Sequence, residues 1–316
     1  MSIPNKIRKV VFCGLDNGGK TTILLLLNKK FSLLSSVKPS IKAQITSFSI
    51  LGFEISSWDL GGQKTYREGY LHNKEKYFTK IHSLFFVIDI QKKDKFNEGL
   101  VYLEELVEIV LELNPNFSQF IILFHKYDPD IQNKREIIDN IDFLEKKIKK
   151  FNKTINFSYY KTSIYDEQTL LTAFSEGAIS ITEKSKLMQS LLKEYTKKTF
   201  SSAAIILDKH SFIIASRATK EYYEQICKSI ATYLTYTMEK LESWDVKPMD
   251  IITNIEFPYE KNNELREGII FFKKFNFNGN KLYLIVLCLN KKIKDTSYEY
   301  LPRLVNNLRN LFESFD

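Results

Sequence analysis

Short apolar runs alternate with amphipathic stretches along the first part of the chain. The runs are rich in Val, Ile and Phe, end at turn residues and predict strands. They lie at Ile7–Leu15, Ile45–Leu60, Ser83–Ile90, Gln119–Asp128 and around Phe157. Helical periodicity follows several of them, at Thr21–Phe31, Asn97–Asn114 and Glu167–Ile181. Because strands that alternate with helices form parallel sheets covered on both faces, we expect an α/β domain with a doubly wound, mainly parallel sheet.

The pattern changes near residue 182. A helical stretch is followed there by two adjacent strand-like runs, a long helix, three further strand-like runs and a closing helix. These segments are Thr182–Thr199, Ser201–Asp208, Ser211–Ala218, Lys220–Ser243, Ile251–Phe257, Gly268–Phe277, Lys281–Leu289 and Ser297–Phe315. Asn278, Gly279 and Asn280 predict a hairpin turn between the last two strands. We therefore expect two domains, 1–182 and 183–316, the second an α+β domain with an antiparallel sheet.

Composition agrees with two globular domains. The chain has 316 residues, of which 44% are hydrophobic, enough to form ordinary cores. Its net charge of +8 is evenly spread, since residues 1–182 contain 25 basic and 21 acidic residues and residues 183–316 contain 21 and 17. The run EKKIKKFNK from Glu145 could form a nucleic-acid or lipid patch, but its lysines lie beside apolar residues at helical spacing. We interpret it as a solvated helix face and expect no nucleic-acid partner.

The sequence predicts no direct membrane anchor. Its longest apolar runs are shorter than the roughly 18 residues that a spanning helix needs. Ser2 follows Met1 where myristoylation needs glycine, and the ending ESFD has no prenylation cysteine. Cys13, Cys227 and Cys288 lie in apolar runs without metal-ligand spacing, which favours a reducing compartment. We expect a cytoplasmic protein that reaches membranes only through partners.

Three of the 11 glycines lie in GLDNGGKTT, Gly14–Thr22. This segment fits the phosphate loop G-x-x-x-x-G-K-[ST], and the predicted strand before it and helix after it are the context that such a loop requires. In a phosphate loop the backbone N–H groups surround the β-phosphate, the lysine bridges the β- and γ-phosphates, and the threonine hydroxyl binds Mg²⁺. The candidate nucleotide-binding residues are Gly14, Asp16, Asn17, Gly18, Gly19, Lys20, Thr21 and Thr22.

Two more glycines lie in WDLGGQ, Trp58–Gln63, at the end of a predicted strand. Asp59 is placed to hold Mg²⁺ through water, Gly62 to offer its N–H to the γ-phosphate, and Gln63 to orient the attacking water. The competing interpretation is a strand-ending turn with a structural aspartate. The phosphate loop upstream favours the first interpretation, so Lys20 and Gln63 are the predicted catalytic residues.

The third motif is HKYD, His125–Asp128, which follows the strand-like run FIILF. A carboxylate there can accept hydrogen bonds from N1 and N2 of guanine, whereas adenine would leave it unpaired. Asp128 therefore predicts GTP rather than ATP. We expect the stem of Lys126 to lie along the purine, and Ser163 and Ile164, in the segment TSI, to supply the last base contacts.

Together these motifs resemble those of two small GTPase families. GLDNGGKTT and WDLGGQ resemble the Arf type, whereas HKYD, in place of the usual NKxD, and TSIYDEQTLLTAFS resemble the Rag/Gtr GTPases. Rag proteins carry a roadblock domain after the GTPase domain, and archaeal-type GTPases that mix both sets of features are similar as well, so the motifs leave the branch open. The resemblance implies Mg²⁺ with GTP or GDP as ligands, and a homo- or heterodimer through a roadblock-like, longin-like domain at residues 183–316.

At two positions this sequence differs from the usual motifs of these families. The first switch normally offers a threonine to Mg²⁺, and KPSIKAQIT aligns Ser40 with it, with Ser35, Ser36 and Thr46 as alternatives. His125 replaces an asparagine that normally ties the base loop to the phosphate loop. Rag-like proteins also have histidine there, so we expect guanine binding to persist. The predicted metal ligands are Thr21, Ser40 and Asp59.

Arginine is scarce in the predicted GTPase domain, which has only Arg8, Arg67 and Arg135. Arg67 follows Gln63 by four residues, as in the Arf pattern, and we expect it to contact a switch or a partner rather than to act as an arginine finger. Such a finger is worth about 10³–10⁵ in rate. We therefore expect slow hydrolysis, with GTPase-activating and exchange proteins as partners.

These features predict a guanine-nucleotide switch that hydrolyses GTP and whose partner binding depends on the nucleotide. The alternative is a scaffold that holds guanine nucleotide without hydrolysing it and acts through its second domain. An ATP-dependent enzyme is a third class, which Asp128 disfavours.

Overall fold

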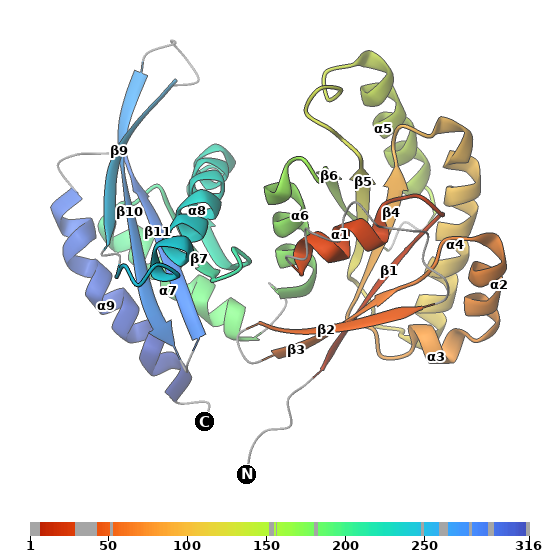
Figure 1. Cartoon of the computed structure of the whole chain (residues 1–316), viewed down its shortest axis with the longest axis horizontal. Helices are drawn as coiled ribbons and strands as arrows, with labels where there is room; N and C mark the ends of the chain where they lie inside the picture. The colour runs from red at the N-terminus through yellow and green to blue at the C-terminus, as the bar shows by residue number, and fades with distance from the viewer. Residues whose placement is uncertain are drawn as a thin grey trace. The chain divides into compact units, whose positions relative to one another are not determined.

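The computed structural model describes residues 7–28, 43–50, 53–151, 155, 157–179, 183–247, 250–258, 265–277, 280–289 and 294–313. The chain forms two compact units, Ile3–Ala178 and, in the main, Ile179–Asp316 (Figure 1). Each unit has its own hydrophobic core and its own sheet.

The first unit is built on a six-stranded sheet of order β2-β3-β1-β4-β5-β6. β2 runs antiparallel to β3, and the other neighbouring strands are parallel. The strands are β1 (Arg8–Gly14), β2 (Gln44–Ile50), β3 (Phe53–Asp59), β4 (Ser83–Asp89), β5 (Phe120–His125) and β6 (Phe157–Thr162). The mainly parallel sheet predicted from the sequence is therefore confirmed.

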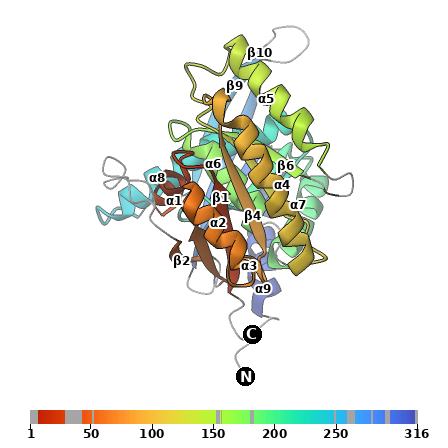
Figure 2. The same cartoon turned by 90° about the vertical axis from the view of Figure 1, so that its right-hand side faces the viewer.

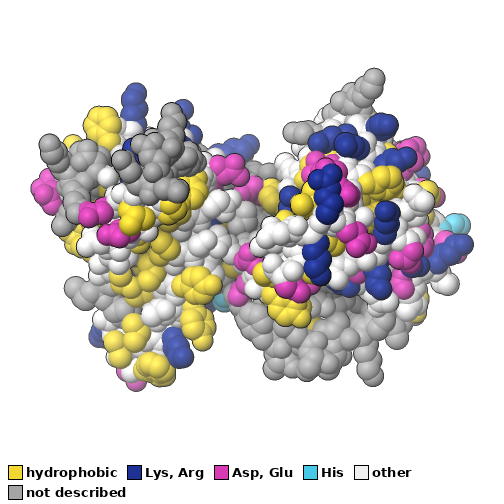
Figure 3. All heavy atoms as spheres, turned by 90° about the horizontal axis from the view of Figure 1, so that it is seen from above, with side chains coloured by type: hydrophobic (Ala, Val, Ile, Leu, Met, Phe, Trp, Pro, Cys, Tyr) yellow, Lys and Arg dark blue, Asp and Glu magenta, His cyan; other side chains and the backbone are white. Residues whose placement is uncertain are grey.

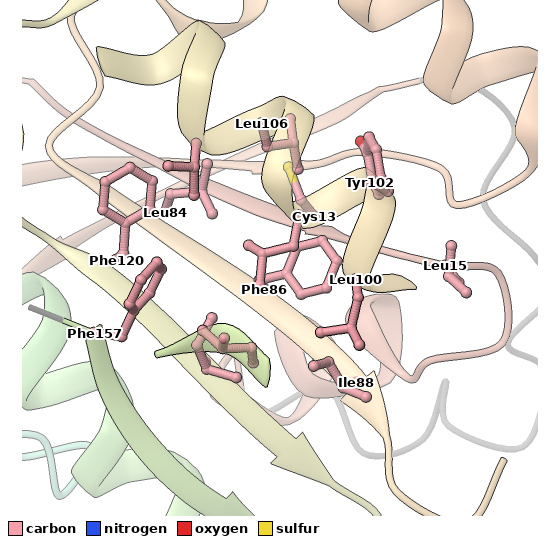
Figure 4. Packing of buried hydrophobic residues seen from close by; sticks show 14 of the residues in the cluster. Cys13, Leu15, Leu84, Phe86, Ile88, Leu100, Tyr102, Leu106, Phe120 and Phe157 are labelled. Carbon is pink, nitrogen blue, oxygen red and sulfur yellow. The ribbon is translucent and has the colours of Figure 1, made fainter. Parts of the chain in front are cut away.

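Helices cover both faces of this sheet, as its apolar strands require. α1 and α6 lie on one face, and α2 to α5 lie on the other (Figures 1 and 2). The helices are α1 (Lys20–Leu27), α2 (Lys64–His72), α3 (Lys74–Phe78), α4 (Phe96–Leu113), α5 (Arg135–Ile148) and α6 (Glu167–Phe174), the last followed by a π-helical turn at Ser175–Ile179. Tyr102 and Leu106 of α4 lie over Cys13 and Phe86 of the sheet, which anchors this helix in the core (Figure 4).

One expectation about the strands was wrong. The run Ile45–Leu60 was predicted as a single strand, but the structure divides it into β2 and β3, paired antiparallel with Ile50 opposite Phe53. Two half-buried strands of a hairpin both alternate polar and apolar residues, so the alternation continues across the turn and does not reveal it.

The second unit contains a five-stranded antiparallel sheet of order β8-β7-β11-β10-β9. α8 packs against one face, where Tyr223 and Cys227 join the core formed with Tyr283 and Ile285, and α7 and α9 lie on the other face. Its elements are α7 (Glu183–Thr199), β7 (Ala203–Asp208), β8 (Ile213–Ala218), α8 (Glu221–Glu242), β9 (Ile251–Pro258), β10 (Leu265–Phe277), β11 (Asn280–Cys288) and α9 (Lys294–Glu313). This is the predicted order α-ββ-α-βββ-α. Among the helices of the described ranges, none is both long and apolar enough to cross a membrane.

Candidate functional site

The phosphate-loop segment connects β1 to α1 and passes close to its neighbours. Gly14 has a φ of 138° and Gly19 a φ of 97°, values that favour glycine. A Cβ atom at Gly14 would lie 2.3 Å from the carbonyl oxygen of Val87, and one at Gly19 would lie 2.6 Å from Cδ2 of His125. These two positions of the motif therefore require glycine. The loop leads directly into the first turn of α1, where N–H groups without helical partners attract an anion.

Lys20 begins α1 and its side chain is only 5% exposed. Its Nζ donates hydrogen bonds to the carbonyl oxygens of Gly14, at 3.1 Å, and Leu15, at 2.7 Å. Burial lowers the pKa of Lys20, and the nearby charge of Asp59 opposes that shift. An anion held by the loop would act in the same direction as Asp59, because it favours the charged ammonium.

Thr21 and Asp59 bring two oxygen groups together beside this lysine. The Thr21 Oγ1 donates a hydrogen bond of 2.5 Å to Oδ2 of Asp59, which is buried at the end of β3. Thr46, one alternative for the first-switch ligand, lies opposite Ser57, two positions from Asp59 along β3. Ser40, together with Ser35 and Ser36, lies outside the described residues.

The turn after β3 lies directly against the phosphate loop. A Cβ atom at Gly62 would be 2.2 Å from the backbone nitrogen of Asp16, so this contact tolerates only glycine. The N–H of Gly61 donates a hydrogen bond of 3.1 Å to the Tyr70 hydroxyl of α2. Gln63 occupies the N-cap position of α2 and is exposed.

The third motif lies at the carboxyl ends of β5 and β6. The Ser163 hydroxyl donates a 2.5 Å hydrogen bond to Oδ1 of Asp128, and Ile164 lies in the turn that follows. The Nζ of Lys126 donates a 2.9 Å bond to the carbonyl oxygen of Asn17. This bond joins the base motif to the phosphate loop, so the structure brings the predicted base and phosphate residues into one site. Gly18 and Thr22 complete the loop and the first turn of α1.

The side chain of His125 is held beneath the phosphate loop by packing contacts. Its ring is buried against Gly19, and Nδ1 lies 3.1 Å from the Thr162 hydroxyl. Burial, together with the charge of Lys126, lowers the pKa of His125 to about 4. The ring is therefore neutral near pH 7 and connects the two loops through van der Waals contact.

A sequence model of the Gtr1/RagA G protein conserved region matches residues 9–237. The chain belongs to the Gtr1/RagA G protein family. The match covers the whole candidate site described above and continues into α8 of the second unit.

The chain is similar to individual proteins of both the Rag/Gtr and the Arf-like kind. GTP-binding protein gtr1 of Schizosaccharomyces pombe is 23% identical over 220 residues, which are 68% of this chain and 69% of that protein. Ras-related GTP-binding protein B of Rattus norvegicus is 22% identical over 163 residues, 51% of this chain and 42% of that protein, so the match spans less than half of the rat protein. ADP-ribosylation factor-like protein alp41 of S. pombe is 31% identical over 156 residues, 49% of this chain and 72% of that protein. The resemblance to both Rag/Gtr and Arf-like proteins is confirmed.

A G protein of this family is a nucleotide-binding switch that binds GTP and GDP with Mg²⁺. The residues present fit these ligands. The glycine loop with its buried ammonium group suits phosphates, and the hydroxyl of Thr21 and the carboxylate of Asp59 are the hard oxygen donors that Mg²⁺ prefers. Beside the loop, a cavity of about 240 Å³ reaches from Asp16 and Asn17 to Lys126.

Two residues beside the predicted base motif of this G protein were missed in the sequence. Asp89, at the end of β4, accepts a 2.6 Å hydrogen bond from Nζ of Lys126 through Oδ2 and a 3.0 Å bond from the N–H of Gln91 through Oδ1. The side-chain amide of Gln91 donates in turn to the carbonyl oxygen of Lys126, at 2.8 Å, and to Oδ2 of Asp128, at 3.2 Å. The run SLFFVIDI carried a signal for Asp89, because the acidic residue ends a parallel strand whose neighbour ends at His125.

Proposed function

We propose that the chain hydrolyses GTP slowly at this site and that the bound nucleotide controls its partners. The observation that carries the proposal is the hydrogen bond between Lys126 and Asn17, because it holds the base motif directly beside the phosphate loop. A guanine nucleotide would place its base at the first of these segments and its phosphates at the second. The pairing of Ser163 with Asp128 supports guanine in particular, because it orients a carboxylate that can accept the N1 and N2 hydrogens.

Lys20 and the loop amides bind the β- and γ-phosphates in this proposal, and Thr21 and Asp59 hold the metal, with Ser40 as the first-switch ligand. The bound Mg²⁺ neutralises charge that develops on the phosphate oxygens. Lys20 contributes a preorganised positive charge, since its ammonium is already fixed under the loop.

Gln63 orients the attacking water. The position of Gln63 supports this role, because it precedes α2 at the turn that contacts the phosphate loop. Hydrolysis is slow in this proposal because no arginine among the described residues is placed to act as a finger. Arg67 already contacts Glu98 and Tyr102, and the phosphate loop contains no arginine. An activating protein is then needed to supply the missing charge, and exchange proteins to release GDP.

Competition binding and single-turnover hydrolysis test this function. GTP and GDP should displace a fluorescent GDP from the purified chain, whereas ATP should not. Gln63→Leu should slow hydrolysis of bound GTP at least about tenfold while GDP affinity stays unchanged. Equal displacement by ATP would point to an ATP-dependent enzyme. A hydrolysis rate that Gln63→Leu does not change would instead favour a scaffold that holds its nucleotide without using it.

We also propose that the second unit is a roadblock-like dimerisation domain. Its element order, and the exposed aromatic residues Tyr233 and Tyr236 on α8, support an interaction surface. Figure 3 shows hydrophobic side chains gathered over part of this unit, whereas basic and acidic side chains are interspersed over the first. Light scattering at micromolar concentration tests the proposal, and a particle of 37.1 kDa with either nucleotide would contradict a homodimer.

A further inference from the structure

The side chain of Arg67 connects the first turn of α2, which follows Gln63, to α4. The carbonyl oxygen of Gln63 accepts hydrogen bonds of 3.0 Å from the N–H groups of Tyr66 and Arg67, which form the first turn of the helix. The orientation of Gln63 therefore depends on where this turn is held.

The side chain of Arg67 holds the turn against α4. It is only 8% exposed, its guanidinium is paired with the carboxylate of Glu98, and it lies 5.0 Å from the centre of the Tyr102 ring. Lys95 also contacts Glu98, at 3.1 Å, so the carboxylate keeps one cation when Arg67 is removed. An arginine uses its planar group for both contacts at once, which a lysine cannot do.

The hydrophobic core holds α4 in place, so this helix can position the first turn of α2. Tyr102 is buried, and it lies with Leu106 over Cys13 and Phe86 in the core of the sheet (Figure 4). The phosphate loop leaves the same sheet at the end of β1. A contact from α2 to α4 therefore sets the position of the turn that carries Gln63 relative to the phosphates.

We propose that Arg67 is a positioning residue for Gln63, which acts by fixing the first turn of α2 on Glu98 and Tyr102. The inference rests on the proposed role of Gln63 in hydrolysis. The expectation was that Arg67 contacts a switch or a partner rather than acting as an arginine finger, and in this structure its guanidinium contacts Glu98 and Tyr102 of α4. A purely structural role, in which Arg67 only helps α2 to pack, is the competing explanation.

The test combines Arg67→Met, which keeps the length of the side chain and removes its charge, with Gln63→Leu. Single-turnover hydrolysis of bound GTP, GDP affinity and thermal stability are measured for both single variants and for the double variant. We expect Arg67→Met to slow hydrolysis about tenfold, because small misplacements of a catalytic group have large effects on rate, while GDP affinity changes less than about twofold. In the Gln63→Leu background the same substitution should cause no further slowing, because residues that act as one unit have non-additive effects.

Two further variants separate positioning from packing. Arg67→Lys keeps the charge and should restore part of the lost rate, to within about threefold of the unsubstituted chain. Arg135→Met removes an exposed arginine of α5 that pairs with Asp139 and should leave hydrolysis unchanged.

The outcomes are distinguishable. If Gln63→Leu slows hydrolysis but Arg67→Met does not, or slows it equally in both backgrounds, the inference is wrong and the proposed function stands. A parallel loss of GDP affinity and thermal stability, without rescue by lysine, supports the purely structural role instead. If Gln63→Leu has no effect, the proposed role of Gln63 and the inference fail together.

Discussion

At the scale of single residues, the site depends on groups whose charge is set by burial. His125 is the clearest case, because its ring is buried between Gly19 and Thr162 and must remain neutral there. Burial, with a contribution from Lys126, lowers its pKa from 6.5 to about 4. The imidazole therefore makes stability depend on pH in a predictable direction.

We expect the free energy of unfolding to fall as the pH falls from 6.5 to 4. In that window the unfolded chain binds a proton at His125 that the folded chain does not, so acid favours unfolding. The effect is on the order of 3 kcal/mol across the window. Urea unfolding at several pH values should show a weaker pH dependence for His125→Asn than for the unsubstituted chain. His72→Asn, at an exposed histidine, is the control, and an equal change in both variants would contradict the argument.

Asp89 gives a second prediction about a single residue. Asp89→Asn keeps an acceptor for Nζ of Lys126 but removes the charge that strengthens the bond. We expect GDP affinity to fall about fivefold, corresponding to about 1 kcal/mol, because Lys126 is then held less firmly between Asp89 and Asn17. Titration with fluorescent GDP measures this change. Asp142→Asn, at an exposed aspartate of α5, should have no effect, and a similar loss in both variants would mean that only overall charge matters.

The motif residues could be predicted because their positions are fixed by local sequence. Lys20 and Asp128 each occupy a set place in a short pattern between a strand and a helix or turn. Gln91 and Glu98 could not be predicted in the same way. Their partners Asp128 and Arg67 are distant in sequence, and only the assembled sheet brings them together.

At the scale of elements, the hydrophobic pattern does not determine every boundary and turn, and contacts between elements decide the rest. The patterns located most helices and strands of both units, but they did not divide β2 from β3 or indicate the π-helical turn Ser175–Ile179. That turn brings Gly177 against the sheet, where Ser83 donates a hydrogen bond to its carbonyl oxygen. The side chain of Phe85 lies below it, stacked on Phe12 at 4.7 Å.

This contact predicts that Gly177→Ala destabilises the first unit. The added Cβ would lie 2.6 Å from Cζ of Phe85 and 3.1 Å from two carbon atoms of Ile121, in a core with no space to accept it. Overpacking of this kind costs about 1–3 kcal/mol. Gly69→Ala in α2 is the matched control, because its Cβ meets nothing within 4 Å and alanine there should stabilise the helix by about 0.5–1 kcal/mol. Denaturant unfolding that gives the same sign for both variants would contradict the prediction.

At the scale of the whole molecule, the chain joins two units with different surfaces. The first unit carries the nucleotide site, at the carboxyl ends of the parallel strands of its sheet. The second contains no part of that site among the described residues, yet it exposes large aromatic side chains, with Tyr233 75% and Tyr236 67% exposed on α8. Aromatic residues are enriched at protein interfaces because they bury much area at low entropic cost. A dimer formed through this surface would use a unit that contributes no described residue to the nucleotide site.

The last prediction concerns this dimer. Because both tyrosines lie on the solvent face of α8, Tyr233→Glu with Tyr236→Glu should leave the core of the second unit intact and weaken self-association at least about tenfold. Light scattering and sedimentation of the full chain measure the change, and GDP affinity should remain the same, since the first unit is untouched. Phe200→Glu is the control, because Phe200 is 74% exposed but follows α7, on the other face of the sheet. Equal dissociation by both changes would show that added charge, and not the α8 surface, separates the copies.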